Sequence, residues 1–149
     1  MLDPHSWMRR QIAIVAASLM LALTALPHQA TAQTVPEGAA VRAVIEDQLS
    51  AFLRDDLVAA FRHASPMVQG RFRTPTRFGM MVERGYPMIR KPRRYDMGRY
   101  SDTPAGPIQI VTFVDEAGVA WEAEYRMRNI DGDWRIAGVS LKRLPGFST

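Results

Sequence analysis

The spacing of the apolar residues changes at Tyr86, and this change constrains the fold more than any other feature of the chain. Before Tyr86, apolar residues recur at steps of three and four, which is the period of an amphipathic helix. After it they alternate with polar residues, as in a β-strand with one buried face. Helices followed by consecutive strands indicate an α+β domain in which the helices pack on an antiparallel sheet.

The first half of the chain carries start signals for consecutive helices. The apolar residues between positions 39 and 53 predict a first helix with one polar side. The later signals are Asp55 or Asp56 as the cap of a second helix, Ser65-Pro66 as the start of a short turn, and Thr74-Pro75 as the start of a third helix that ends at Gly85.

The second half predicts strands. They cover residues 87–90, 95–100, 108–114, 119–128 and 134–144. In the strand that starts at Val119, the odd positions through Met127 are apolar and the even positions from Glu122 to Arg128 are charged, so the odd positions should face the core. Asp131-Gly132 predicts a tight hairpin turn before the last strand.

Two of these strands are apolar on both faces, which predicts a partner surface. Val111, Phe113, Val139 and Leu141 alternate with a second apolar set on the same strands. We expect these four residues on the outer face of the sheet, where an apolar patch needs a cover. The cover is either a partner or another part of the chain, and we expect a partner, in a homodimer that pairs through this face.

The first 32 residues have the organisation of an export signal. Arg9-Arg10 precede an uncharged apolar run from residue 12 to residue 26, and Ala30-Thr31-Ala32 follows as a cleavage site. The run is too short for a transmembrane helix. Cleavage after Ala32 would leave a periplasmic or secreted protein with no membrane anchor. The paired arginines also suit export of the folded chain, although the strongly apolar run favours export of the unfolded chain.

The predicted organisation is a signal peptide over residues 1–32, a flexible arm over 33–40, one α+β domain over 41–144 and a tail over 145–149. The absence of cysteine excludes disulfides, a thiol nucleophile, thiolate metal sites and iron–sulfur clusters. A formal net charge of +4 does not indicate nucleic-acid binding. No motif indicates a phosphate-binding loop, a nucleophile elbow or a zinc site, so we expect no cofactor and no metal.

The stretch from Asp56 to Pro92, with later tryptophan motifs, resembles a bacterial family known as domain of unknown function 4864. The residues that carry the resemblance are Ala60-Phe61, Ala64-Ser65-Pro66, Phe72, Thr74-Pro75, Phe78, Met81-Val82, Gly85-Tyr86-Pro87, Pro92, Gly118-x-x-Trp121 and Trp134-Arg135-Ile136. The resemblance implies a fold similar to nuclear transport factor two: a cystatin-like cone of three helices on a strongly bent antiparallel sheet. That superfamily contains isomerases, dehydratases, cyclases and non-catalytic binding modules, and the family implies no catalytic residue.

Asp56 and His63 are candidate catalytic residues, because a spacing of seven places them on one face of a helix. A carboxylate and an imidazole in a pocket can act as a base and its orienting partner. The alternative, which we favour, is that Asp56 caps a helix and His63 lies at its surface end.

Aromatic residues form a second candidate site. Tyr86, Trp121 and Tyr125 are candidate ligand-binding residues, and the two tyrosines are also candidate catalytic hydrogen-bond donors. The alternative is ordinary core, in which each polar tip bonds to backbone.

Arg90, Lys91, Arg93 and Arg94 form a third candidate site. Four charges around Pro92 suit an anion such as a lipid head group, and the alternative is a solvated connector.

Taken together, the residues favour an exported accessory or ligand-binding domain without catalytic activity. The rival hypothesis is a small cofactor-free isomerase, dehydratase or hydrolase-like enzyme, with a pocket carboxylate or His63 as base and a tyrosine as donor. A cavity of several hundred Å³ with at least two of these polar groups inside it is what the rival hypothesis requires.

Overall fold

The computed structural model describes residues 36–146, and the structural statements below concern that part of the chain. The elements are α1 (Glu37–Leu53), α2 (Leu57–Arg62), α3 (Pro66–Phe72), α4 (Pro75–Gly85), α5 (Pro87–Arg90), β1 (Arg94–Ser101), β2 (Ile108–Val114), β3 (Ala120–Ile130) and β4 (Asp133–Arg143). The predicted signal peptide and its cleavage site lie outside the described residues. None of the described helices has the length and hydropathy needed to cross a membrane.

Three of the helices start at the predicted caps. The Asp56 side chain accepts a hydrogen bond from the backbone N–H of Ala59 at 2.9 Å and so caps α2. Ser65 and Thr74 cap α3 and α4 in the same way, and each is followed by proline at the first helical position. Side-chain oxygens at this position satisfy N–H groups that have no partner within the helix, which is why these short helices begin where they do.

Two segments differ from the predictions. The first helix begins at Glu37, so its first turn takes up part of the range expected as a flexible arm. Residues 87–90, predicted as a short strand, form the helical turn α5, and that prediction is wrong. Pro87 fixes a backbone torsion that suits the first turn of a helix, and the N–H groups of Ile89 and Arg90 donate to the carbonyl of Tyr86.

The four strands form an antiparallel sheet in the order β1-β2-β3-β4. The β3–β4 hairpin turns at Asp131 and Gly132, which have φ values of 53° and 93°. A tight two-residue hairpin turn requires positive φ at both positions. The Asp-Gly pair therefore forms the turn that the sequence predicted. The register also shifts within β1–β2 and β3–β4, and such irregularities bend a sheet.

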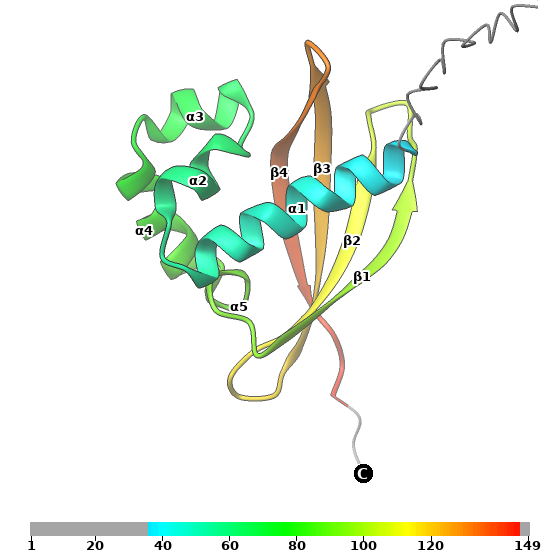
Figure 1. Ribbon diagram of the computed structural model, residues 1–149. Helices are drawn as coiled ribbons and strands as arrows, with labels where there is room; N and C mark the ends of the chain where they lie inside the picture. The colour runs from blue at the N-terminus through cyan, green and yellow to red at the C-terminus, as the bar shows by residue number, and fades with distance from the viewer. Residues whose placement is uncertain (1–35, 147–149) are drawn as a thin grey trace, which may run out of the picture. The chain divides into compact units, whose positions relative to one another are not determined.

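The core lies between α1 and one face of the sheet. Helix α1 runs across that face, while α2, α3 and α4 group beside β4 (Figure 1). Ile45 and Leu49 from α1 and Phe113 from β2 are completely buried, and they belong to one cluster with the inner face of β3. Burial of such side chains, at about 1.5 to 3 kcal/mol each, is the main source of stability in a chain without disulfides.

The prediction for the outer face of the sheet is wrong. Val111 and Phe113 are completely buried on the inner face, and Val139 and Leu141 also pack against the core. A strand that is apolar on both faces does not reveal which face is inside, because a shift of one residue exchanges the two. These four residues therefore form no apolar patch on the outer face. The homodimer was inferred from that patch, and it remains an untested prediction.

Candidate functional site

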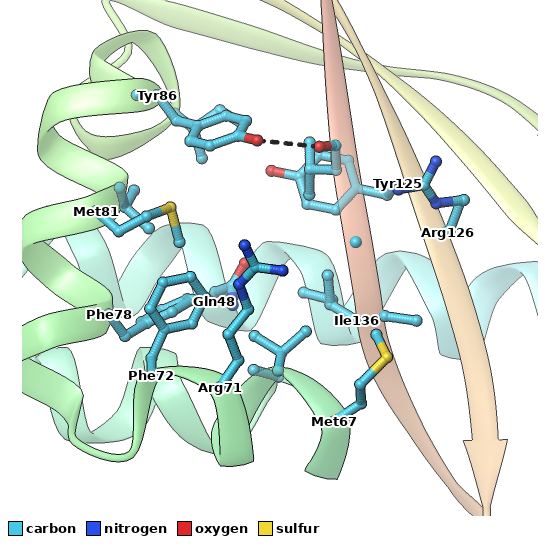
Figure 2. Close-up of a pocket in the computed structure, with 18 of the residues that line it drawn as sticks. Gln48, Met67, Arg71, Phe72, Phe78, Met81, Tyr86, Tyr125, Arg126 and Ile136 are labelled. Atoms are coloured by element: carbon cyan, nitrogen blue, oxygen red, sulfur yellow. Dashed lines mark hydrogen bonds between the residues drawn. The ribbon is translucent and has the colours of Figure 1, made fainter.

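A cavity of about 830 Å³ lies between the helical group and the edge of the sheet at β4. Figure 2 shows its wall, to which α1, α3, α4, α5, β3 and β4 all contribute. Most of the wall is apolar, and its larger side chains are Phe52, Met67, Val68, Phe72, Phe78, Met81, Val82, Ile89, Ile136 and Val139. The polar side chains of the wall are Gln48, Arg71, Tyr86, Tyr125 and Arg126.

The cavity lies beside short helices, α2, α3 and α4, that are tied to β4 and to α1 by a few hydrogen bonds. The segment between α2 and α3 is tied to β4, where Ile136 donates its N–H to the carbonyl of His63 and accepts from the N–H of Ser65. From this anchor α3 extends for only seven residues, and none of them is buried. A helix this short fills little of the space beside a sheet edge, so a hollow remains between α3, α4 and β4.

Tyr125 supplies the most unusual polar group of the cavity wall. Its side chain comes from the inner face of β3 and is completely buried. The hydroxyl has no hydrogen-bonding partner among the described residues. Burial raises the pKa of this phenol well above its ordinary value, so the hydroxyl keeps its proton. Leaving a buried polar group unpaired costs about 1 to 3 kcal/mol, so such a group needs an explanation, and a functional role is one.

Tyr86 and Gln48 are polar groups of the wall that already have partners. The Tyr86 hydroxyl donates to the backbone carbonyl of Val139 at 3.2 Å, shown as the dashed line in Figure 2. Gln48 lies on the buried face of α1, and its Nε2 donates to the carbonyl of Ala60 at 3.0 Å. Both side chains therefore hold elements together as well as lining the cavity.

The two arginines of the wall point in different directions. In Figure 2, Arg71 reaches from α3 into the space that the other side chains surround, whereas Arg126 points away from it. The Arg126 guanidinium crosses the backbone at Gly138, where an added Cβ would lie 2.7 Å from one of its nitrogens. Arg71 is thus the cationic side chain of the wall that faces the cavity.

The structure does not bring Asp56 and His63 together as a catalytic pair. Asp56 is exposed and caps α2, and His63 ends the same helix; neither lines the cavity. Burial lowers the pKa of His63, and the nearby Arg135 acts in the same direction. Within the described part of the chain, the wall contains no aspartate, glutamate or histidine.

Of the three predicted ligand-binding residues, the structure places Tyr86 and Tyr125 in the cavity and leaves Trp121 outside it. The Trp121 indole nitrogen donates to the Asp115 carboxylate at 2.9 Å, beside the turn between β2 and β3. This hydrogen bond lowers the pKa of Asp115. Trp121 therefore fixes a turn at the other end of the sheet.

The four basic residues of the predicted anion site are divided among different roles. Arg90 turns inward: it donates to the carbonyl of Phe52, forms an ion pair with Asp55 and has a side chain only 11% exposed. Arg94 pairs with Asp96 at 3.2 Å. Lys91 and Arg93 remain exposed. The four charges therefore do not face one common site.

Of the five polar wall residues, the sequence analysis missed Gln48, Arg71 and Arg126, and of these three Arg126 points away from the cavity. Gln48 carried a usable signal, because it is a polar residue on the apolar stripe of the first helix, next to Leu49. Arg71 carried none, since an arginine on a short amphipathic helix usually faces water. No group of three or more acidic or histidine side chains in residues 36–146 could hold a metal ion.

The comparisons with known proteins identify the family of this chain but no individual relative. No curated protein and no solved structure matches this chain, so the likeness to nuclear transport factor two stays a prediction. The model of a family described as "Domain of unknown function (DUF4864)" matches residues 34–149. That range covers every described helix and strand. This chain therefore belongs to the DUF4864 family, as the motifs between Asp56 and Pro92 indicated.

Proposed function

We propose that this protein binds a small, largely apolar molecule in the cavity beside β4. The observation that carries the proposal is a cavity of about 830 Å³ with a mostly apolar wall and one buried, unpaired hydroxyl. Small-molecule sites are typically clefts of about 300 to 1,000 Å³ with a few polar groups that fix the orientation of the ligand. The Tyr125 hydroxyl, which solvent does not reach in the structure, would supply such a group on ligand binding, as a donor to an oxygen or nitrogen of the ligand.

The chemistry of the wall supports binding over catalysis. A cofactor-free isomerase, dehydratase or hydrolase needs a group that takes a proton from its substrate. Tyr125 holds its proton because burial raises its pKa, and the Tyr86 hydroxyl is engaged with Val139. Asp56 and His63, the predicted bases, lie outside the wall. The cavity thus meets the size condition of the enzyme hypothesis and has two hydrogen-bond donors, but lacks the proposed base.

The proposal includes the location of the protein. The arginine pair, the apolar run and the Ala30-Thr31-Ala32 site support export and cleavage. Mass spectrometry of protein recovered outside the cytoplasm should find Gln33 at the N-terminus. Recovery of a chain that keeps Arg9 would contradict cleavage, and recovery only from the cytoplasm would contradict export.

A fluorescent apolar probe tests binding in the cavity. N-phenyl-naphthylamine is neutral and becomes bright in an apolar site, so a titration should give saturable fluorescence with the purified protein. Replacement of Val68, which lines the cavity from α3, by tryptophan should place a large ring in that space and abolish the signal. The matched control is Val58→Trp on α2, because Val58 is 60% exposed and does not line the cavity.

The two variants separate cavity binding from adsorption to the surface. The proposal expects loss of probe binding in Val68→Trp and unchanged binding in Val58→Trp, with the same melting cooperativity in both. Equal binding by both variants would place the probe elsewhere. Absence of saturable binding by the unaltered protein would contradict the proposal.

A further inference from the structure

The charged groups around the cavity are of one sign. Arg71 faces the cavity from α3 and is exposed to solvent. Among the described residues, it takes part in no ion pair. The wall has no carboxylate of its own. A ligand that enters beside α3 would therefore meet a cation whose charge no described neighbour neutralises.

The two polar groups that a ligand would meet, Tyr125 and Arg71, differ in how deeply they are buried. Tyr125 is completely buried and Arg71 is exposed, while the apolar rings of Phe72 and Phe78 and the thioether of Met81 belong to the same wall. A matching ligand has an apolar body for this wall and one anionic group that stays close to solvent. A planar guanidinium suits a carboxylate, because two parallel N–H groups can donate to its two oxygens.

We infer that the ligand of this cavity is an amphipathic carboxylate whose acidic group is held by Arg71. The inference rests on the proposed function and adds the chemical class of the ligand. The carboxylate remains at the rim, where little of its hydration is lost, and its apolar tail replaces the solvent beside the aromatic rings of α3 and α4. The Tyr125 hydroxyl is then available to ligands that carry a second acceptor deeper in the tail.

Three probes with alkyl tails of similar length and different charge test the inference. They are decanoate, its neutral methyl ester and decyltrimethylammonium, each used to displace N-phenyl-naphthylamine from the purified protein. Ion pairs at exposed sites contribute up to about 1 kcal/mol, so decanoate should bind roughly twofold to fivefold more tightly than the ester. The cation should bind most weakly of the three. Added salt should weaken the binding of decanoate and leave the binding of the ester unchanged.

Arg71→Gln and Arg126→Gln form the matched pair of variants. Both remove one positive charge from an exposed residue that contributes to the wall, but only Arg71 points inward. Arg71→Gln should make decanoate and the ester bind equally while leaving the ester unchanged. Arg126→Gln should keep the preference for decanoate, and Arg71→Lys should keep part of it because the charge remains without the paired donors.

The outcomes separate this inference from the proposed function. If the neutral probe and all three ligands bind with equal affinity and Arg71→Gln changes nothing, the cavity binds apolar molecules and the inference about charge is wrong. An equal loss of preference in Arg126→Gln would also contradict it, since the effect would then follow net charge. If the neutral probe does not bind to the unaltered protein, the proposed function fails and the inference fails with it.

Discussion

Tyrosine-to-phenylalanine substitutions at Tyr125 and Tyr86 should change stability in opposite directions. Both remove one hydroxyl from the cavity wall and leave the ring in place. At Tyr125 the hydroxyl is buried without a partner among the described residues, so its removal ends a penalty of about 1 to 3 kcal/mol. At Tyr86 the hydroxyl donates to the Val139 carbonyl at 3.2 Å, so its removal should cost about 0.5 to 1.5 kcal/mol.

Urea unfolding of the two variants and the unaltered protein measures this contrast. We expect a higher midpoint for Tyr125→Phe and a lower one for Tyr86→Phe, with a common slope, because the surface exposed on unfolding is unchanged. For a domain of this size, 1 kcal/mol corresponds to about 4 °C in melting temperature. Tyr125→Phe should also weaken the binding of ligands that accept a hydrogen bond. The variant would then gain stability at the expense of function.

The result that would refute this reasoning is a loss of stability in Tyr125→Phe as large as that in Tyr86→Phe. Such a loss would mean that the Tyr125 hydroxyl has a partner in the folded protein and is a structural group. The support that Tyr125 gives to a ligand site would then disappear.

Three other changes test the packing and the charges. Gly79→Ala should not stabilise the protein in urea unfolding, although alanine favours a helix over glycine by about 1 kcal/mol, because the new Cβ would lie 2.5 Å from a methyl carbon of Leu57, whose side chain would have to turn away; a gain of the full ~1 kcal/mol would contradict this tight contact. Arg90→Met should lower the melting temperature clearly and Arg93→Met should not, because only the first is buried against α1; equal effects would contradict the division of the basic residues. Burial lowers the pKa of His63 below its ordinary value of 6.5, so its contribution to stability is complete above that pH and is lost as the pH falls toward the lowered pKa. His63→Gln should therefore flatten the loss of stability between neutral pH and about pH 5 in urea titrations, and an unchanged pH profile would contradict the shift.

Much of the fold could be predicted because its signals are local. Ser65-Pro66, Thr74-Pro75 and Asp131-Gly132 each determine the backbone within a few residues, and all three elements start or turn where the sequence indicated. The strand from Ile108 to Val114 was predicted with its observed bounds for the same reason.

The wrong predictions concern segments whose structure depends on packing against distant parts of the chain. Residues 87–90 are apolar enough for a strand, but Met88 and Ile89 are both buried, and adjacent strand residues would face opposite sides. The inner face of β2 depends on its register with β3, and the strand alone does not specify it.

The candidate site shows the same division between local and distant signals. Tyr125 was identified from its position on the apolar face of its strand and Tyr86 from its position after Gly85, but the same pattern also selected Trp121, which lies outside the cavity. Arg90 was assigned to an exposed basic link, yet its partners Phe52 and Asp55 lie more than thirty positions earlier. The direction of Arg71 likewise depends on how α3 is anchored to β4 at Ile136, which no local pattern encodes.

The central claim, that the cavity beside β4 is a ligand site, can be tested directly with the methionine methyl groups. Met67 and Met81 line the cavity, whereas Met80 and Met97 do not. In a protein labelled at methionine methyl carbons, titration with N-phenyl-naphthylamine should shift the signals of Met67 and Met81 saturably and leave those of Met80 and Met97 in place. Saturable shifts at Met80 or Met97 without shifts at Met67 and Met81, or no saturable shift at all, would contradict the claim.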